Sequence, residues 1–247
     1  MSDNFLEEKN KLSDIWRLVL DSKRSGKENM LIDSQNLSRA IENRKFTPVL
    51  RFYDWIRPTI SLGYGQKRSD IDYAKCERDG IDVVIRPTGG RAVFHVNEIT
   101  YSIVIPAANS ISELSILESY RLISNAFVRG FRELGLEAEI SRGEIGMYKS
   151  ASCFSSTSRY EVVFQGKKLI GSAQRRKKGA LLQQGSIPLD EKYLNLMNYY
   201  SNIPADIDLN SKSSYIYNFL DKSLQRKEII EKFLCGFKEE LSIKFLG

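Results

Sequence analysis

The 247 residues of the chain are enough for one large α/β domain or two small ones, and a hydrophobic content of 42% can fill a sizeable core without disulfides or metals. A net charge of +6 is modest, and the basic residues do not form one stripe with interleaved aromatics, which argues against a nucleic-acid-binding protein. Three cysteines without a CxxC spacing and a single histidine argue against a zinc site, and neither a secretory signal nor an apolar run of membrane length is apparent. We therefore expect a cytoplasmic protein that does not bind a membrane.

In the first half of the chain, short β-rich runs are interleaved with helical patterns. β-Branched and aromatic residues bounded by Gly or Pro predict strands, and apolar residues at helical spacing predict helices. In chain order we expect a strand at 15–20, a helix at 28–44, strands at 49–55 and 59–64, a short helix at 72–79 that Gly80 ends, a strand at 81–86, and one or two strands within 92–105. The apolar spacing at 15–20 also suits a helix.

The clearest helix of the second half is expected at 111–134, because Ser110 and Glu113 form a capping-box pattern and Gly135 stands where a helix terminator belongs. A hairpin should follow, from residues 161–164 and 168–173 around a Gln-Gly turn. A strand at 180–189 and a helix at about 227–241 come next, and Cys235 falls in the apolar stripe of that helix, where we expect it in the core. Because strands and helices are mixed without strict βαβ alternation, the sequence predicts an α+β fold with a mixed sheet.

The segment RPTGGRAVFH at 86–95 is the first candidate site. Gly89–Gly90 permits positive φ and a close backbone approach, so exposed N–H groups there can face a carbonyl or phosphate oxygen with Arg86 or Arg91 alongside. The alternative is an ordinary strand-turn-strand. His95 is equally open, either as a base or as a hydrogen-bonded structural residue. The chain has neither the GxGxxG nor the GxxxxGK[ST] phosphate motif.

Cys153 and Lys168 are the second candidate site. A free thiol titrates near pH 8.5, and an ammonium within a few ångströms favours the thiolate. The two residues are 15 positions apart with a hairpin between them, so contact is possible. The alternative is that Cys153 is a small buried side chain. Cys76 lies in a polar, helical segment.

The densest basic run is RRKK at 175–178. Such a run is usually part of a solvated loop. It can also serve as a docking patch for an acidic partner, either a nucleic acid or an acidic carrier protein.

Several separated motifs follow one another along the chain: LRFYDW at 50–55, SLGY at 61–64, RPTGGRAVFH at 86–95, EITYS at 98–102, GKKLIGSAQ at 166–174 and QGSI at 184–187. Together they resemble the lipoate-protein ligase and octanoyltransferase superfamily, which includes the biotin ligases. The likeness runs from about Trp16 to Leu189. Within the superfamily the chain is most similar to the LipM type of octanoyltransferase, which shares the Pro-Thr-Gly-Gly-Arg loop and a Cys-Phe pair before the hairpin.

This resemblance implies a single catalytic domain over residues 1–247, with a core at about 16–190 and a C-terminal helical segment at about 191–247. Its fold would be a mixed β-sheet flanked by helices, with the acyl chain in a tunnel beside the Gly-Gly loop. Cys153 would be the nucleophile and Lys168 would lower its pKa. The residues implied to bind substrate are Arg86, Thr88, Gly89, Gly90, Arg91, Ala92, His95, Gly171, Ser172 and Ala173.

The implied reaction moves an octanoyl group from octanoyl-acyl carrier protein, through a Cys153 thioester, to a lysine of a lipoyl domain of a 2-oxoacid dehydrogenase or of the glycine-cleavage H protein, in lipoate biosynthesis. Because thioester to amide is downhill, no ATP, other cofactor or metal is implied. The alternatives are an ATP-dependent lipoate ligase, in which Cys153 is incidental, an amidotransferase acting between lipoyl domains, and an acyl-binding module without turnover.

Two positions depart from the family pattern. Leu31 stands where the family often has alanine and would narrow whatever packs there. Val96 stands where an acidic residue usually follows the histidine. Both bear on acyl specificity.

Overall fold

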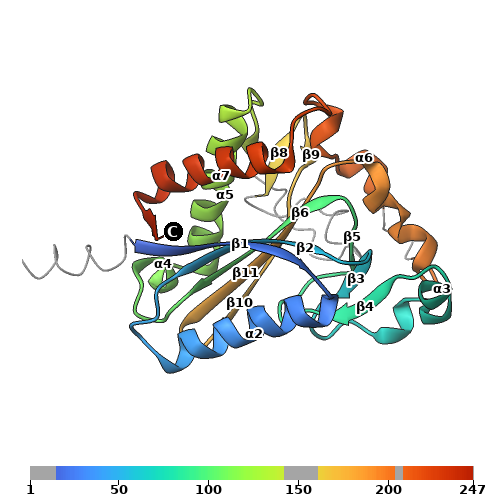
Figure 1. The fold of residues 1–247 in the computed structure, drawn as a ribbon, viewed down its shortest axis with the longest axis horizontal. Coiled ribbons are helices and arrows are strands. Elements are labelled where there is room, and N and C mark those ends of the chain that lie inside the picture. Colours follow the sequence, from blue (N-terminus) through green and yellow to red (C-terminus); the bar gives the residue numbers. More distant parts are fainter. Residues whose placement is uncertain (1–14, 142–160, 204–207, 247) are drawn as a thin grey trace, which may run out of the picture.

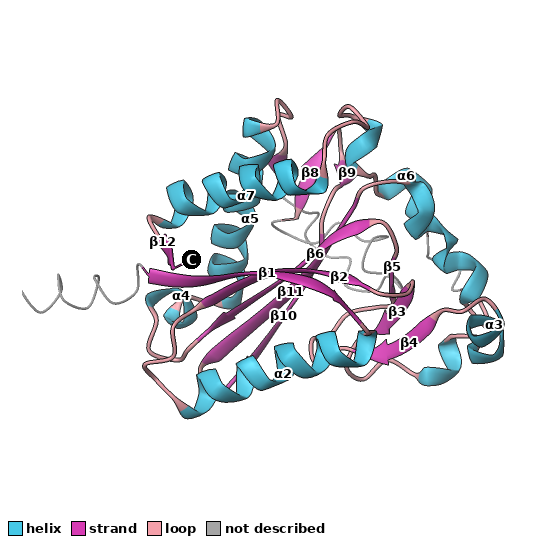
Figure 2. Cartoon of the chain, viewed as in Figure 1, coloured by secondary structure: helices cyan, strands magenta, loops and turns pink. Residues whose placement is uncertain are grey.

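A six-stranded mixed sheet forms the centre of the molecule (Figures 1 and 2). The computed structural model describes residues 15–141, 161–203 and 208–246. In the order β10-β11-β6-β2-β1-β12, the strands of the large sheet are β10 (Gly171–Lys177), β11 (Ala180–Pro188), β6 (Glu98–Ile105), β2 (Val49–Trp55), β1 (Ile15–Arg24) and β12 (Lys244–Leu246). β1 runs parallel to both of its neighbours and the remaining pairs are antiparallel, which confirms the predicted mixed sheet.

Helices cover both faces of this sheet. α2 (Gly26–Glu42) lies along one face, and α5 (Ile116–Glu133) and α7 (Arg226–Leu241) pack together on the other (Figure 1). The ring of Phe127 in α5 meets Phe233 and Phe237 of α7 edge-on, with centroids 5.2 and 5.0 Å apart. The C-terminal helix therefore belongs to the main core, and β12 extends the sheet beside β1.

A three-stranded sheet, β4-β3-β5, lies beside the N-terminal end of α2 and has its own core. Its strands are β3 (Thr59–Leu62), β4 (Asp82–Ile85) and β5 (Val93–His95). α3 (Tyr73–Arg78) and the 3-10 helix η2 (Glu191–Tyr199) cover it, and Cys76 of α3 is buried there.

The remaining described elements are short. They are the small sheet β7 (Glu139–Ile140), β8 (Val162–Phe164) and β9 (Lys167–Lys168), the helices α4 (Ser110–Glu113) and α6 (Leu209–Lys212), and the 3-10 helices η1 (Arg68–Asp70) and η3 (Ile216–Asn218). Over the described ranges, none of the helices has the length and apolar character that crossing a bilayer requires.

The helix expected at 111–134 is confirmed over Ile116–Glu133 as α5, but its first turn is a separate helix, α4, so the predicted start is wrong. Its capping box is also misplaced, because Ser115 and Glu118 cap α5 whereas Asn109 caps α4. The guanidinium of Arg176 accounts for the break, since it donates to the carbonyls of Ser112 and Leu114 at 2.9 and 2.6 Å. Those carbonyls would otherwise accept bonds within one continuous helix.

Two further expectations differ from the structure. The hairpin turns at Gln165–Gly166 with positive φ at both residues, as predicted, but its second strand ends at Lys168, and Gly171 begins β10 in the large sheet. Cys235 is exposed instead of buried, because it lies on the outer side of α7.

Candidate functional site

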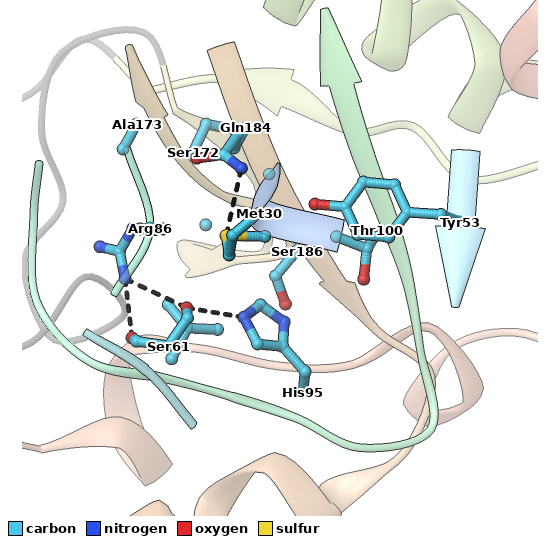
Figure 3. Close-up of a pocket in the computed structure, with 13 residues that line it drawn as sticks. Met30, Tyr53, Ser61, Arg86, His95, Thr100, Ser172, Ala173, Gln184 and Ser186 are labelled. Atoms are coloured by element: carbon cyan, nitrogen blue, oxygen red, sulfur yellow. Dashed lines mark hydrogen bonds between the residues drawn. The ribbon is translucent and has the colours of Figure 1, made fainter. Parts of the chain in front are cut away.

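A pocket lies between the large and the small sheet, beside the first turns of α2 (Figure 3). Its open space is about 20 Å³, roughly the room of one water molecule, so a longer ligand requires a side chain to move. Met30, at the centre of the view in Figure 3, is an unbranched and adaptable side chain in that position. The lining residues are Met30; Tyr53; Ser61; Arg86; Val93 and His95; Thr100; Gly171, Ser172 and Ala173; and Gln184, Gly185 and Ser186.

Strand register explains how distant motifs meet at the wall of the large sheet. Gly171 is paired with Ser186, Ser186 with Thr100, and Thr100 with Tyr53, so one row crosses four strands. Side chains of one row face the same side of a sheet. Ser61, Val93 and His95 of β3 and β5 supply the facing wall.

A hydrogen-bonded chain of buried side chains crosses the small-sheet side of the pocket. His95 Nε2 lies 2.7 Å from Ser61 Oγ, and His95 Nδ1 lies 2.6 Å from Glu98 Oε1. The carboxylate of Glu98 also accepts from the hydroxyls of Thr100 and Ser186. Positive φ at Asn97 turns the chain so that Glu98, the first residue of β6, comes back onto His95.

Glu98 and His95 are fixed by their surroundings. Burial raises the pKa of Glu98, but the interaction with His95 and the hydrogen bonds that the carboxylate accepts outweigh burial and hold the pKa below its ordinary value. The imidazole stacks on Trp55 with ring centroids 4.2 Å apart, and Trp55 Nε1 donates to Thr100 at 2.7 Å. Within the described ranges, no group of three or more His, Cys, Asp and Glu side chains gathers to hold a metal.

The guanidinium of Arg86 holds the Gly-Gly loop from inside. It donates to the carbonyl of Ser61 at 2.8 Å, to that of Gly89 at 2.7 and 3.1 Å, and to that of Arg91 at 2.7 Å. Gly90 has a φ of 88°, and a Cβ on Gly63 would stand 1.9 Å from the Gly90 carbonyl oxygen. The loop therefore needs glycine at both places.

A second buried network fixes the same loop from below. Thr88 Oγ1 donates to Gln184 at 2.8 Å, and Gln184 Nε2 donates to Asp33 at 2.7 Å. Asp33 forms a fully buried ion pair with Arg51 at 2.9 Å and also accepts from Ser102 at 2.7 Å. The motif residues of α2, β2 and β11 thus act as a scaffold beneath the loop.

Lys168 lies next to Glu161 in the β8–β9 hairpin. Lys168 Nζ is 2.5 Å from Glu161 Oε1, and the two side chains are 2% and 4% exposed. A buried ammonium requires a compensating anion, which Glu161 supplies. β10, which lines the pocket, begins three residues after Lys168, although Lys168 itself is not a lining residue.

The sequence-predicted site residues divide into three groups. Arg86, His95, Gly171, Ser172 and Ala173 line the pocket. Cys153 lies outside the described residues. The others are not among the lining residues: Thr88, Gly89, Gly90 and Arg91 are in the loop, Ala92 is in the core of the small sheet, and Lys168 is in the hairpin.

The departures from the family pattern do not narrow the pocket. Leu31 is 56% exposed on the outer side of α2, whereas its neighbour Met30 lines the pocket. Val96 packs against the core of the small sheet, and Glu98 supplies the acidic partner of His95. Arg176, in the basic run, bonds internally, and Lys177 and Lys178 are exposed.

Sequence reasoning missed Ser61, Glu98 and Glu161 as site residues. Ser61 and Glu98 stood within quoted motifs, and their alternation on predicted strands was the available signal. For Glu161, the only signal in the sequence was its position at the start of the predicted hairpin.

Known proteins resemble the chain in sequence and in fold. A profile of the lipoyl protein ligase A/B catalytic domain matches residues 26–238. Octanoyltransferase LipM of Carboxydothermus hydrogenoformans is 41% identical over 238 residues, which cover 94% of this chain and 88% of that protein. LipM of Clostridioides difficile is 37% identical over 241 residues, 94% of this chain and 89% of that protein.

Solved structures share the architecture. A lipoate-protein ligase A bound with ATP is 26% identical with a TM-score of 0.74, and the match covers 94% of this chain and 87% of that one. A putative lipoate protein ligase from T. acidophilum with bound lipoic acid has a TM-score of 0.72 at 24% identity with the same coverage, and its likeness is one of fold.

Proposed function

The chain belongs to the family of lipoyl protein ligase A/B catalytic domains, and from that premise we propose that it moves an octanoyl group from octanoyl-acyl carrier protein to a protein lysine through a thioester on Cys153. It is an acyltransferase of the octanoyltransferase kind, as its near full-length relatives are. The observation that carries the proposal is the pocket between the two sheets, whose walls come from the motifs of this family.

The chemistry runs in two transfers. Cys153 Sγ attacks the thioester carbon, the new C–S bond forms, and the thiol of the carrier leaves. The amine of the acceptor lysine then attacks the same carbon, a C–N bond forms, and Cys153 is released. The first transfer exchanges one thioester for another, so its free-energy change is close to zero. The second transfer converts a thioester into an amide, which is favourable in free energy, so the reaction requires no ATP.

Lys168 is the cation in this scheme, where it would favour the thiolate of Cys153 and hold the carbonyl region of the donor. Its burial and its ion pair with Glu161 support a fixed position for the ammonium. Glu161 is then the residue that holds Lys168.

The pocket is the proposed binding site of the octanoyl chain. Each methylene that enters it gains about 0.8 kcal/mol of transfer free energy. Binding requires Met30 or a neighbour to give way, because the open space is about 20 Å³. Substrate contacts are assigned to the lining residues Arg86, His95, Gly171, Ser172 and Ala173. The loop residues Thr88, Gly89, Gly90, Arg91 and Ala92 would shape the wall.

The acceptor we propose is a lipoyl domain of a 2-oxoacid dehydrogenase or the glycine-cleavage H protein. The family description, a lipoyl protein ligase, supports a lipoyl-bearing acceptor. The exposed Lys177 and Lys178 and the net charge of +6 suit acidic partner proteins.

The test mixes the protein with octanoyl-acyl carrier protein without ATP and reads its intact mass. We expect one octanoyl adduct that hydroxylamine removes and that is missing in Cys153→Ala. Cys235→Ala, which changes an exposed thiol on α7, serves as the matched control and should keep the adduct.

An ATP-dependent lipoate ligase is the second candidate, favoured by the likeness to a lipoate-protein ligase A bound with ATP. It predicts no adduct from the carrier thioester and modification of a lipoyl domain by free lipoate with ATP. That pair of results would overturn the transferase.

A further inference from the structure

Ser61, His95 and Glu98 form a hydrogen-bonded chain in the pocket that the roles given to Cys153 and Lys168 do not use. Each adjacent pair is at hydrogen-bond distance, 2.7 Å from Ser61 Oγ to His95 Nε2 and 2.6 Å from His95 Nδ1 to Glu98 Oε1. A hydroxyl, a base and an orienting carboxylate at these distances have the geometry of a general-base relay. Ser61 and His95 line the pocket, so the hydroxyl end of the relay faces the ligand space (Figure 3).

The direction of the hydrogen bonds follows from the carboxylate. An ionised Glu98 only accepts, so His95 Nδ1 carries a proton, and in the neutral imidazole Nε2 then accepts from the Ser61 hydroxyl. Thr100 and Ser186 donate to the same carboxylate and keep it in place. The carboxylate therefore holds the imidazole in one orientation.

The charged group that faces the other end of the relay is Arg86. Its Nη1 is 3.3 Å from Ser61 Oγ and also donates to the Ser61 carbonyl, whereas Nε and Nη2 donate to loop carbonyls. A hydroxyl has two acceptor lone pairs, so Ser61 can accept from Arg86 and from an incoming N–H while it donates to His95.

The relay is linked through the large sheet to the start of β10, the strand that follows Lys168 in the chain. Gly171 follows Lys168 by three residues, at most about 11 Å along the chain. Gly171 is paired with Ser186, whose hydroxyl donates to Glu98. The register thus ties the acid of the relay to the first residue of β10, three residues after the proposed cation.

We propose that this relay deprotonates the acceptor lysine in the second transfer, an inference that rests on the proposed function. A lysine amine has an ordinary pKa of about 10.4, so at neutral pH nearly all of it is ammonium and cannot attack. In the proposed step one proton of the ammonium passes through Ser61 Oγ to His95 Nε2, the nitrogen–carbon bond forms, the bond to Cys153 Sγ breaks, and the departing sulfur takes the second N–H proton. The imidazolium then returns the proton to water, and the first transfer needs no such base.

The experiment isolates the second step. Octanoylated wild type, Glu98→Gln and His95→Gln are prepared with octanoyl-acyl carrier protein, and their discharge is timed with an acceptor protein and, separately, with hydroxylamine. Hydroxylamine needs no deprotonation at neutral pH. From the same acylated protein, we expect discharge to the lysine to fall by a factor of about 10² or more relative to discharge to hydroxylamine.

A matched control is Glu133→Gln, an exposed glutamate at the end of α5, which should leave both discharges unchanged. Equal loss of acylation, hydroxylamine discharge and lysine discharge would show that the three residues only shape the pocket, and would overturn the relay. Wild-type discharge to lysine in both variants would overturn it as well. A wild type that never becomes acylated would instead contradict the proposed function.

Discussion

Gly63 makes the closest backbone approach of the pocket loop. Its Cβ, if present, would stand 1.9 Å from the carbonyl oxygen of Gly90, and backbone cannot give way as a flexible side chain can. We predict that Gly63→Ala lowers the free energy of unfolding in urea by about 1–3 kcal/mol, the range for overpacking. Gly89→Ala is the matched control, because a Cβ there meets nothing within 4 Å, and it should change stability little. Equal effects of the two changes would contradict the close approach.

Glu98 should give the folded state a specific dependence on pH. Its pKa is lower in the folded protein than the ordinary 4.5, so the unfolded chain binds the proton at a higher pH. The stabilisation is then complete above about pH 4.5 and is lost as the pH falls through the folded value. Urea unfolding from pH 7 to 3.5 should show the stability difference between wild type and Glu98→Gln narrowing below about pH 4.5. A difference that stays constant over that range would argue that Glu98 is not ionised in the fold.

Some site residues could be predicted from the sequence, whereas the contacts of others could not. The loop glycines and His95 were predicted as site residues because Gly, Pro and a lone His carry local signals. The pairing of His95 with Glu98 was not predicted, since it depends on positive φ at Asn97. Leu31 was expected to narrow the site, but the helix directs it outward and its neighbour Met30 inward.

At the scale of elements, the β8–β9 hairpin is held by the Glu161–Lys168 ion pair. Removing one partner of a buried pair leaves an uncompensated charge and typically costs about 3–5 kcal/mol. We predict losses of that size for Glu161→Gln and for Lys168→Met, and a loss in the double variant well below their sum. The matched control is the exposed pair Lys227–Glu231, where each change should cost less than about 1 kcal/mol. Additive losses in the hairpin would mean that the two side chains are not coupled.

β10 is joined to the start of α5 by Arg176. Its guanidinium bonds the carbonyls of Ser112 and Leu114 and the hydroxyl of Ser119. We predict that Arg176→Ala destabilises the fold by about 1–3 kcal/mol, because the carbonyls lose charged donors. Lys177→Ala, on the next and exposed residue of the same strand, should change the unfolding midpoint little. A neutral Arg176→Ala would leave the break between α4 and α5 without an explanation.

The elements that were predicted well from the sequence are those that local patterns determine. Strands β2 and β11 and helix α7 follow from local alternation, helical period and Gly or Pro boundaries. The break between α4 and α5 depends on a side chain about sixty residues away in the chain, so no local pattern shows it. The division of 168–173 between two sheets is likewise set by pairing, with Gly171 opposite Ser186.

At the scale of the molecule, two sheets and the start of α2 enclose the pocket, and motifs separated by more than a hundred residues meet there. The α+β class and the mixed sheet were predicted from element order. The place of the C-terminal helix was not, because its packing of Phe233 and Phe237 onto α5 is a long-range contact. The family resemblance identified the pocket loop from the sequence, whereas the Ser61–His95–Glu98 relay beside it could be identified only from the structure.

The central claim is that the octanoyl group travels from a carrier thioester through Cys153 to a lysine. The most direct measurement is the mass of a lipoyl domain after incubation with octanoyl-acyl carrier protein and the enzyme, without ATP. The account predicts one octanoyl group on the acceptor lysine with wild type and with Cys235→Ala, and none with Cys153→Ala. Modification that persists in Cys153→Ala, or that appears only with free octanoate and ATP, would contradict it.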